Sequence, residues 1–151
     1  MSRPPERVYL DVCSLCRPFD DQSQMRIRLE TEAVQLILSY IRAHELVLIT
    51  SPVHRVEINA IDDHIERAHL LSTLAEIGQQ AEVDLKATRR RAQELTNAGL
   101  GPADAAHLAF VEAAEASFIS CDDRLLRQCR HIHTAIWCGN PLAFCSENEI
   151  R

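Results

Sequence analysis

The sequence predicts an α/β fold, with a parallel sheet of about four to five strands and helices on both of its faces. Two observations lead to this prediction: several short segments are apolar throughout, and the longer stretches between them carry apolar residues at helical spacing. A third observation is size, because 151 residues with 46% hydrophobic side chains suffice for one core. We therefore expect a single domain over residues 1–151, and the spacing leaves the strand order open.

Short apolar segments are expected to form the strands. Each has the length of a buried strand, and polar or helix-starting residues bound it on both sides. The first strand is expected to continue as far as Val12, and Asn140-Pro141 ends the last one. The expected strands are Val8–Leu10, Leu46–Ile49, Ser117–Ser120 and Ile132–Trp137.

The stretches between these strands are expected to be helical. Asp20–Ser23 offers capping groups to the first long helix, and Ser51-Pro52 has the form of a helix start. Gly99–Gly101 separates two later helices. The expected helices cover residues 27–41, 52–60, 64–77, 81–98 and 102–115, followed by a short helix from Asp122 or Asp123 to about Arg130.

Composition and charge exclude several classes of protein. With 4 Gly, 6 Pro and 25% charged residues, the chain is neither collagen-like nor disordered. It lacks the run of about 18–20 apolar residues that a membrane span needs, and MSRPPERVYLD has no apolar signal-peptide core. A net charge of −6 argues against nucleic-acid binding through a broad basic surface. We expect a cytoplasmic protein.

Cysteines suggest an alternative function. The chain has 6 of them, which a reducing cytoplasm keeps as thiols. Cys13 and Cys16 form a C-x-x-C, so a zinc- or thiol-dependent regulatory or binding protein is one hypothesis. No second pair follows at zinc-ribbon spacing, and cysteine is also a common small buried residue.

Acidic side chains are expected at one edge of the sheet. Asp11 ends the first strand and Asp122 follows the third, while Glu57 and Asp104 lie on helices whose N-termini can point to the same edge. Carboxylates that gather in this way repel one another, and a divalent cation relieves the repulsion. Oxygen ligands favour Mg²⁺ or Mn²⁺ over zinc.

Five short motifs follow in order along the chain. They are Asp11 with Ser14 three positions on, Glu57 after the second strand, Asp104 within Ala103–Ala109, Ser120-Cys121-Asp122, and Asn140-Pro141 with Phe144. In their order and spacing these motifs resemble the PIN-domain ribonucleases, and within them the VapC-type toxins of type II toxin–antitoxin systems. The resemblance covers essentially the whole chain, with Ser120 in place of the usual threonine.

The resemblance implies a three-layer PIN-like fold and a metal-dependent endoribonuclease. Asp11, Glu57, Asp104 and Asp122 would be the catalytic residues and would hold Mg²⁺ or Mn²⁺. Ser14 and Ser120 would support them, and Asp123 would be an auxiliary ligand. Contacts with RNA phosphates are expected from Arg124, Arg89, Arg90 and Arg91.

The resemblance also implies partners for this protein. The expected partners are an RNA substrate, a cognate antitoxin and a second copy of the chain in a homodimer, with no membrane. The apolar sets Ile37, Leu38, Ile41 and Leu70, Leu71, Leu74 would either bind a partner or belong to the core.

A catalytically inactive PIN-like binding module is a further alternative. A phospho-receiver is disfavoured because the single lysine, Lys86, lies in mid-helix, and His107 is interpreted as a helix-face residue.

Overall fold

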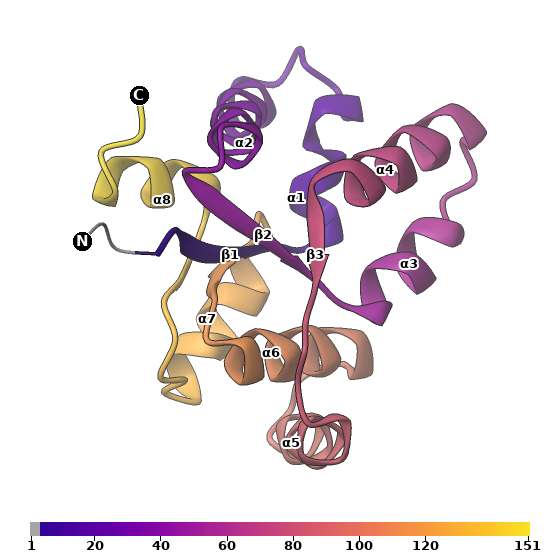
Figure 1. The fold of residues 1–151 in the computed structure, drawn as a ribbon, viewed down its shortest axis with the longest axis vertical. Coiled ribbons are helices and arrows are strands. Elements are labelled where there is room, and N and C mark those ends of the chain that lie inside the picture. The colour runs from indigo at the N-terminus through magenta and orange to yellow at the C-terminus, as the bar shows by residue number, and fades with distance from the viewer. Residues whose placement is uncertain (1–3) are drawn as a thin grey trace.

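A sheet whose neighbouring strands are all parallel runs through the middle of the molecule (Figure 1). The structure is a computed structural model and describes residues 4–151. The strand order is β3-β2-β1-β4-β5, so the first strand is central. This arrangement confirms the predicted α/β class and the parallel sheet of about four to five strands. The strands are β1 (Glu6–Leu10), β2 (Leu46–Thr50), β3 (Gly78–Gln80), β4 (Ser117–Ile119) and β5 (Cys138–Gly139).

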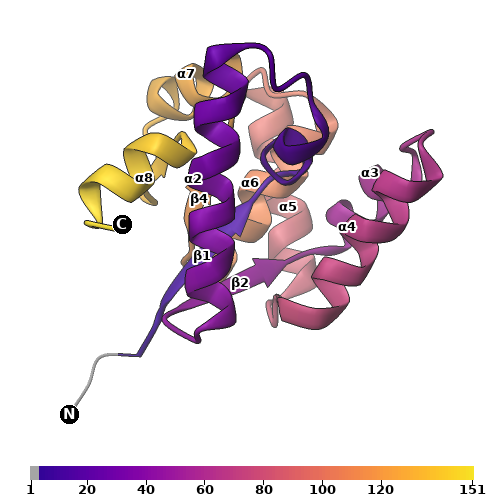
Figure 2. The ribbon, with the colours of Figure 1, turned by 90° about the horizontal axis from the view of Figure 1, so that it is seen from above.

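Helices cover both faces of the sheet, as expected. On one face α2 and α8 lie along the sheet and α3 and α4 lie side by side, while α5, α6 and α7 belong to the other face (Figures 1 and 2). The helices are α1 (Val12–Cys16), the 3-10 turn η1 (Arg17–Phe19), α2 (Met25–Arg42), α3 (Pro52–Asn59), α4 (His64–Ile77), α5 (Leu85–Asn97), α6 (Pro102–Ala114), α7 (Asp123–His131) and α8 (Pro141–Glu147).

The central strand explains why the first apolar segment is apolar at consecutive positions. Val8 and Leu10 face the α2 side and Tyr9 faces the α6 side, and all three side chains are fully buried. Strands with both faces covered read as continuous apolar runs instead of alternating ones. The two apolar sets on α2 and α4, which we expected either in the core or at a partner surface, pack into the core on the first face.

The last expected strand is wrong. Residues 132–137 form turns and bends, and β5 contains only Cys138 and Gly139. His133 adopts a positive φ of 54°, which breaks an extended conformation. Ile132 and Ile136 are apolar because they pack against the core on the α6 side, so burial without strand pairing produced the misleading pattern.

The strand β3 was not predicted, because a glycine and two glutamines give no strand signal. It follows α4 without a loop, and a Cβ at Gly78 would lie 2.5 Å from the Leu74 carbonyl oxygen. The expected helix 81–98 accordingly begins later, at Leu85, where the Asp84 side chain accepts hydrogen bonds from the backbone N–H groups of Lys86 and Ala87.

Two expected boundaries near the N-terminus also differ. The first strand stops at Leu10 because Asp11 caps α1, so Val12 is helical. Helix α2 begins at Met25, and the Asp21 carboxylate accepts hydrogen bonds from Ser23 instead of capping that helix. Of the helices within residues 4–151, none combines the length and the apolar character needed to cross a membrane.

Candidate active site

The chain topology brings the predicted acids toward one edge of the sheet. Asp11 directly follows β1 and Asp122 follows the neighbouring strand β4, and the Asp11 backbone N–H donates to the Ile119 carbonyl at 3.2 Å. Glu57 lies on α3, which leaves the end of β2. Because α6 leads into β4 from the opposite direction, its first turn, with Asp104, lies at the same edge.

The pKa of Asp104 responds to the other three acids. Burial raises the pKa of this half-buried carboxyl, and the charges of Asp122, Asp11 and Glu57 raise it further, whereas His107 opposes them. Four carboxylates from four separate segments therefore share one electrostatic environment. Like charges in such a setting favour either protonation or a bound cation.

Asp11 is the most deeply buried of the four, with 5% of its surface exposed. Its Oδ1 accepts hydrogen bonds from the Ser14 backbone N–H at 3.1 Å and from the Ser14 hydroxyl at 2.8 Å. Its Oδ2 accepts one from the Ser120 hydroxyl at 2.5 Å. Burial raises the pKa of Asp11 above its usual value, and these hydrogen bonds offset only part of the rise. Ser14 and Ser120, predicted as supporting residues, thus hold this carboxylate in place.

Ser120 also connects Asp11 with Asp122. Its hydroxyl oxygen accepts a hydrogen bond from the Asp122 backbone N–H at 3.0 Å while its proton goes to Asp11. Asp122 in turn caps α7, because its Oδ1 accepts from the backbone N–H groups of Arg124 and Leu125. That cap engages one oxygen of an exposed carboxylate.

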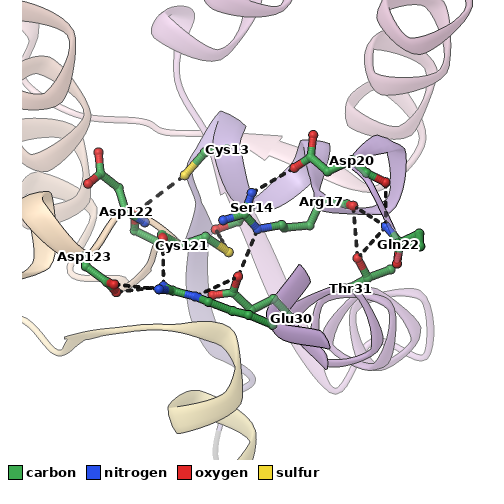
Figure 3. A network of polar contacts seen from close by, with 12 residues as sticks. Cys13, Ser14, Arg17, Asp20, Gln22, Glu30, Thr31, Cys121, Asp122 and Asp123 are labelled. Atoms are coloured by element: carbon green, nitrogen blue, oxygen red, sulfur yellow. Dashed lines mark hydrogen bonds and ion pairs between the residues drawn. The ribbon is translucent and has the colours of Figure 1, made fainter. Parts of the chain in front are cut away.

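Asp123, the predicted auxiliary ligand, faces a different neighbour. The Arg26 guanidinium donates to both of its oxygens, at 2.7 and 2.8 Å, and also to the Cys121 carbonyl. Figure 3 shows the side chains of Asp122 and Asp123 pointing apart. This ion pair joins α2 to α7 and lowers the pKa of Asp123.

Glu57 is held by a residue that we had interpreted as a simple helix-face histidine. His107 is 2% exposed, and its Nε2 is hydrogen-bonded to Glu57 Oε1. This hydrogen bond is the main reason why the pKa of Glu57 is lowered, against the effect of burial. The spacing from Asp104 to His107 is the signal that could have identified His107, since residues i and i+3 share a helix face.

The predicted RNA-contacting arginines are of two kinds. Arg89, Arg90 and Arg124 are exposed on α5 and α7. Arg91 instead donates to Glu112 at 2.9 and 3.2 Å and to Glu94 at 3.1 Å, which ties α5 to α6. Three members of the set are therefore accessible to a ligand and one is engaged within the protein.

The two cysteines of the C-x-x-C have separate partners. The Cys13 thiol donates to Asp11 at 3.1 Å, and its burial raises its pKa. Burial and the neighbouring Glu66 raise the pKa of Cys16 to about 12. Both are protonated thiols at neutral pH, whereas thiol catalysis needs a thiolate. Within residues 4–151, neither cysteine belongs to a group of three His, Cys, Asp or Glu side chains arranged to hold a metal ion such as zinc. This arrangement does not favour the thiol-dependent alternative.

Whether these residues fit a metal ion depends on the chemistry of the donor groups and on how the side chains are arranged. Four carboxylates at one edge of the sheet, three of which help to raise the pKa of the fourth, Asp104, are the donors that a hard divalent cation prefers. In the described part of the chain, however, no three His, Cys, Asp or Glu side chains are arranged to hold a metal ion as they lie. The donor set fits Mg²⁺ or Mn²⁺, and the carboxylates would have to move closer together around it.

Comparisons with known proteins show the fold. No protein-family model matches the chain, and no curated protein is similar enough to match. Among solved structures it is similar to FitAcB from Neisseria gonorrhoeae, with a TM-score of 0.54 and 14% sequence identity. The match covers 89% of this chain and 98% of that one. The likeness thus extends over the whole domain, which has a PIN-like fold.

Proposed function

We propose that this protein is a metal-dependent endoribonuclease and the VapC-type toxin of a toxin–antitoxin pair. The observation that carries the proposal is the position of four acids from four separate segments at one edge of the sheet. They are close enough that the charges of Asp122, Asp11 and Glu57 add to the rise that burial causes in the pKa of Asp104. These four acids occupy the carboxyl edge of a PIN-like parallel sheet, where ligands of open α/β sheets bind.

In this proposal, three groups of residues have different roles. Asp11, Glu57, Asp104 and Asp122 would hold Mg²⁺ or Mn²⁺, which supplies an activated water and stabilises charge on the phosphate. Ser14 and Ser120 keep Asp11 in place through the hydrogen bonds described above. The exposed guanidinium groups of Arg89, Arg90 and Arg124 would contact the RNA backbone despite the negative net charge.

RNA cleavage with defined metals tests this proposal. A panel of tRNAs and structured RNAs is incubated with the protein in Mg²⁺ or Mn²⁺, with and without EDTA. We expect cleavage that EDTA abolishes. Asp104→Asn should reduce the rate about a thousandfold, because removing a ligand costs about 4 kcal/mol of barrier stabilisation.

Asp62→Asn is the matched control for this experiment. Asp62 is an exposed acid between α3 and α4, so its neutralisation should leave the cleavage rate unchanged. Cleavage that persists in EDTA, or an Asp104→Asn variant as active as the control, would exclude the assigned mechanism.

An inactive PIN-like RNA-binding module is the second candidate. It is favoured by the finding that no three potential ligands within residues 4–151 are already arranged around a metal position. RNA binding without turnover in either metal would establish it.

A cytoplasmic toxin implies a cognate antitoxin, which would mask the acids with an arginine or another basic group, and a homodimer. Co-purification with the product of the adjacent gene tests the first partner. Light scattering of the purified protein tests the second, and a monomeric mass at micromolar concentration would rule out a stable homodimer.

A further inference from the structure

A chain of buried polar side chains leads from the central strand to Glu57. The Tyr9 hydroxyl lies 2.7 Å from the Ser51 hydroxyl and is hydrogen-bonded to His107 Nδ1. On its other side, the imidazole of His107 is bonded through Nε2 to Glu57. Tyr9 is fully buried, so these contacts lie within the core and only the Glu57 end reaches solvent.

The members of this chain come from one strand and two helices. Tyr9 lies on β1, Ser51 starts α3, and His107 lies on α6 one turn after Asp104. His54 completes the anchoring: its Nδ1 accepts from the Ser51 backbone N–H at 3.1 Å, and its Nε2 is 2.7 Å from the Leu10 carbonyl. The network therefore joins the backbone just before Asp11 to the helix that carries Glu57.

The donors and acceptors of the network have one consistent order. With Glu57 ionised and the imidazole of His107 neutral, His107 donates through Nε2–H and its Nδ1 is an acceptor. Burial raises the pKa of Tyr9, which keeps its hydroxyl protonated and able to donate to that nitrogen. The Tyr9 oxygen then accepts from the Ser51 hydroxyl. Tyr9 thereby selects the histidine tautomer that presents N–H to Glu57.

We propose that His107 is a positioning residue, held in its Nε2–H tautomer by Tyr9, that orients the Glu57 carboxylate toward the other acids. The inference rests on the proposed function, since it assigns Glu57 to the metal site. A polar chain of this kind is costly to bury unless every group is paired. Here the last hydrogen bond of the chain is made to the partly exposed carboxylate of Glu57, which lies at the acidic edge of the sheet. The orientation of a carboxylate ligand affects metal affinity.

Substitutions of His107 separate positioning from simple packing. His107→Leu fills the space but removes the donor, whereas the amide nitrogen of His107→Gln reaches the region of Nε2 and can still donate to Glu57. We expect His107→Leu to weaken Mn²⁺ binding, measured by calorimetry, roughly tenfold. His107→Gln should recover most of that loss. A role in packing alone would not produce this rescue, since both variants lose the ring.

The tautomer is measured without metal or RNA. Long-range ¹⁵N–¹H correlation spectra at neutral pH should show His107 protonated at Nε2 in the wild type. Tyr9→Phe should populate the Nδ1–H tautomer as well, because the donor to Nδ1 is lost. Tyr40→Phe is the matched control: it removes the hydroxyl that contacts the Arg151 carbonyl, and it should leave the His107 signals unchanged.

Two results would overturn the inference: an Nδ1–H tautomer in the wild type, or wild-type Mn²⁺ affinity in His107→Leu. If that variant also cleaves RNA normally, the proposed function stands while the inference falls. If the tautomer and the Mn²⁺ affinities follow expectation but the wild type cleaves no RNA, the proposed function falls and the inference stands.

Discussion

Two groups of acids lie next to each other at the carboxyl edge of the sheet and are neutralised in different ways. The arginine-paired group consists of Asp20, Glu30 and Asp123, which form ion pairs with Arg17 and Arg26. Figure 3 shows the three acids together with Arg17. We call Asp11, Glu57, Asp104 and Asp122 the unpaired group, because no arginine within residues 4–151 bonds to these side chains; Glu57 is bonded to His107 instead. The boundary between the groups falls between two consecutive residues, Asp122 and Asp123.

Burial makes the contrast clear. Glu30 is only 1% exposed, and its Oε1 lies 3.0 Å from Arg17 Nε and 3.5 Å from Arg26 Nε. Asp11 is nearly as deeply buried, but hydroxyl, thiol and amide groups hold it. Arginines balance the first group and only dipoles balance the carboxylate of Asp11. The difference teaches that this fold can place cations beside acids at this edge, and that none of these arginines bonds to the second group.

The largest expected effect concerns the histidine beneath the unpaired group. Burial lowers the pKa of His54 to about 4, so at neutral pH it adds no positive charge to this region. The unfolded chain binds the proton near pH 6.5, so stability is complete above that value and falls as pH drops toward 4. We expect this histidine to account for about 3 kcal/mol between pH 7.5 and pH 4.

Urea denaturation of the wild type and His54→Gln across this range measures the His54 effect. The difference between their pH slopes isolates His54 from the neighbouring Glu57 and His107. Parallel slopes would mean that His54 is not buried in its neutral form, and the region would then hold a compensating charge.

The second prediction is that a divalent cation stabilises the unpaired group, which has no arginine partner. Mn²⁺ at a hundred times its Kd should stabilise the wild type by about 2.7 kcal/mol, because it binds only the folded chain. Asp104→Asn should lose most of this gain while being slightly more stable without metal. Its wild-type carboxyl has a raised pKa, so charging it as pH rises costs folding energy. Thermal unfolding with and without Mn²⁺ measures both effects, and equal Mn²⁺ stabilisation of the variant would contradict the grouping.

The smallest effect is expected in the arginine-paired group. Glu30→Gln keeps the volume but leaves Arg17 and Arg26 without their shared buried carboxylate, and we expect a loss of about 2 kcal/mol. Asp123→Asn is the control, because its ion pair with Arg26 is exposed and should contribute less than about 1 kcal/mol. Chemical denaturation compares the two, and neither variant should change the Mn²⁺ stabilisation. A change in that quantity would show that the two groups act as one.

The sequence predicted those parts of the fold whose signal is local. The strands β1, β2 and β4 are apolar because both faces of the sheet are covered, and Pro52 and Pro102 begin α3 and α6 as proline at the first helical position predicts. The strand β3 has no such signal: it consists of a glycine and two glutamines, and its backbone pairs with β2 where a Cβ at Gly78 would collide with Leu74 and Thr50.

For the site, the residue types could be predicted but their pairings could not. Two acids that follow strands, and two on helices that meet the same edge, follow from the topology of a parallel sheet. The order in which Tyr9, Ser51, His107 and Glu57 bond depends on contacts between residues as far as 98 positions apart. The spacing to Ser120 separates Asp122 from Asp123 in the sequence, but the pairing of Asp123 with Arg26 on α2 could not be predicted.

Asp11 performs two tasks that a single substitution cannot separate. Its carboxylate accepts the backbone N–H of Ser14 in the first turn of α1 and also belongs to the unpaired group. Loss of this side chain would therefore loosen the turn from strand to helix at the same time as it removes a charge. An inactive variant at this position says little about chemistry, and Asp104, which starts no helix, is the better place to probe it.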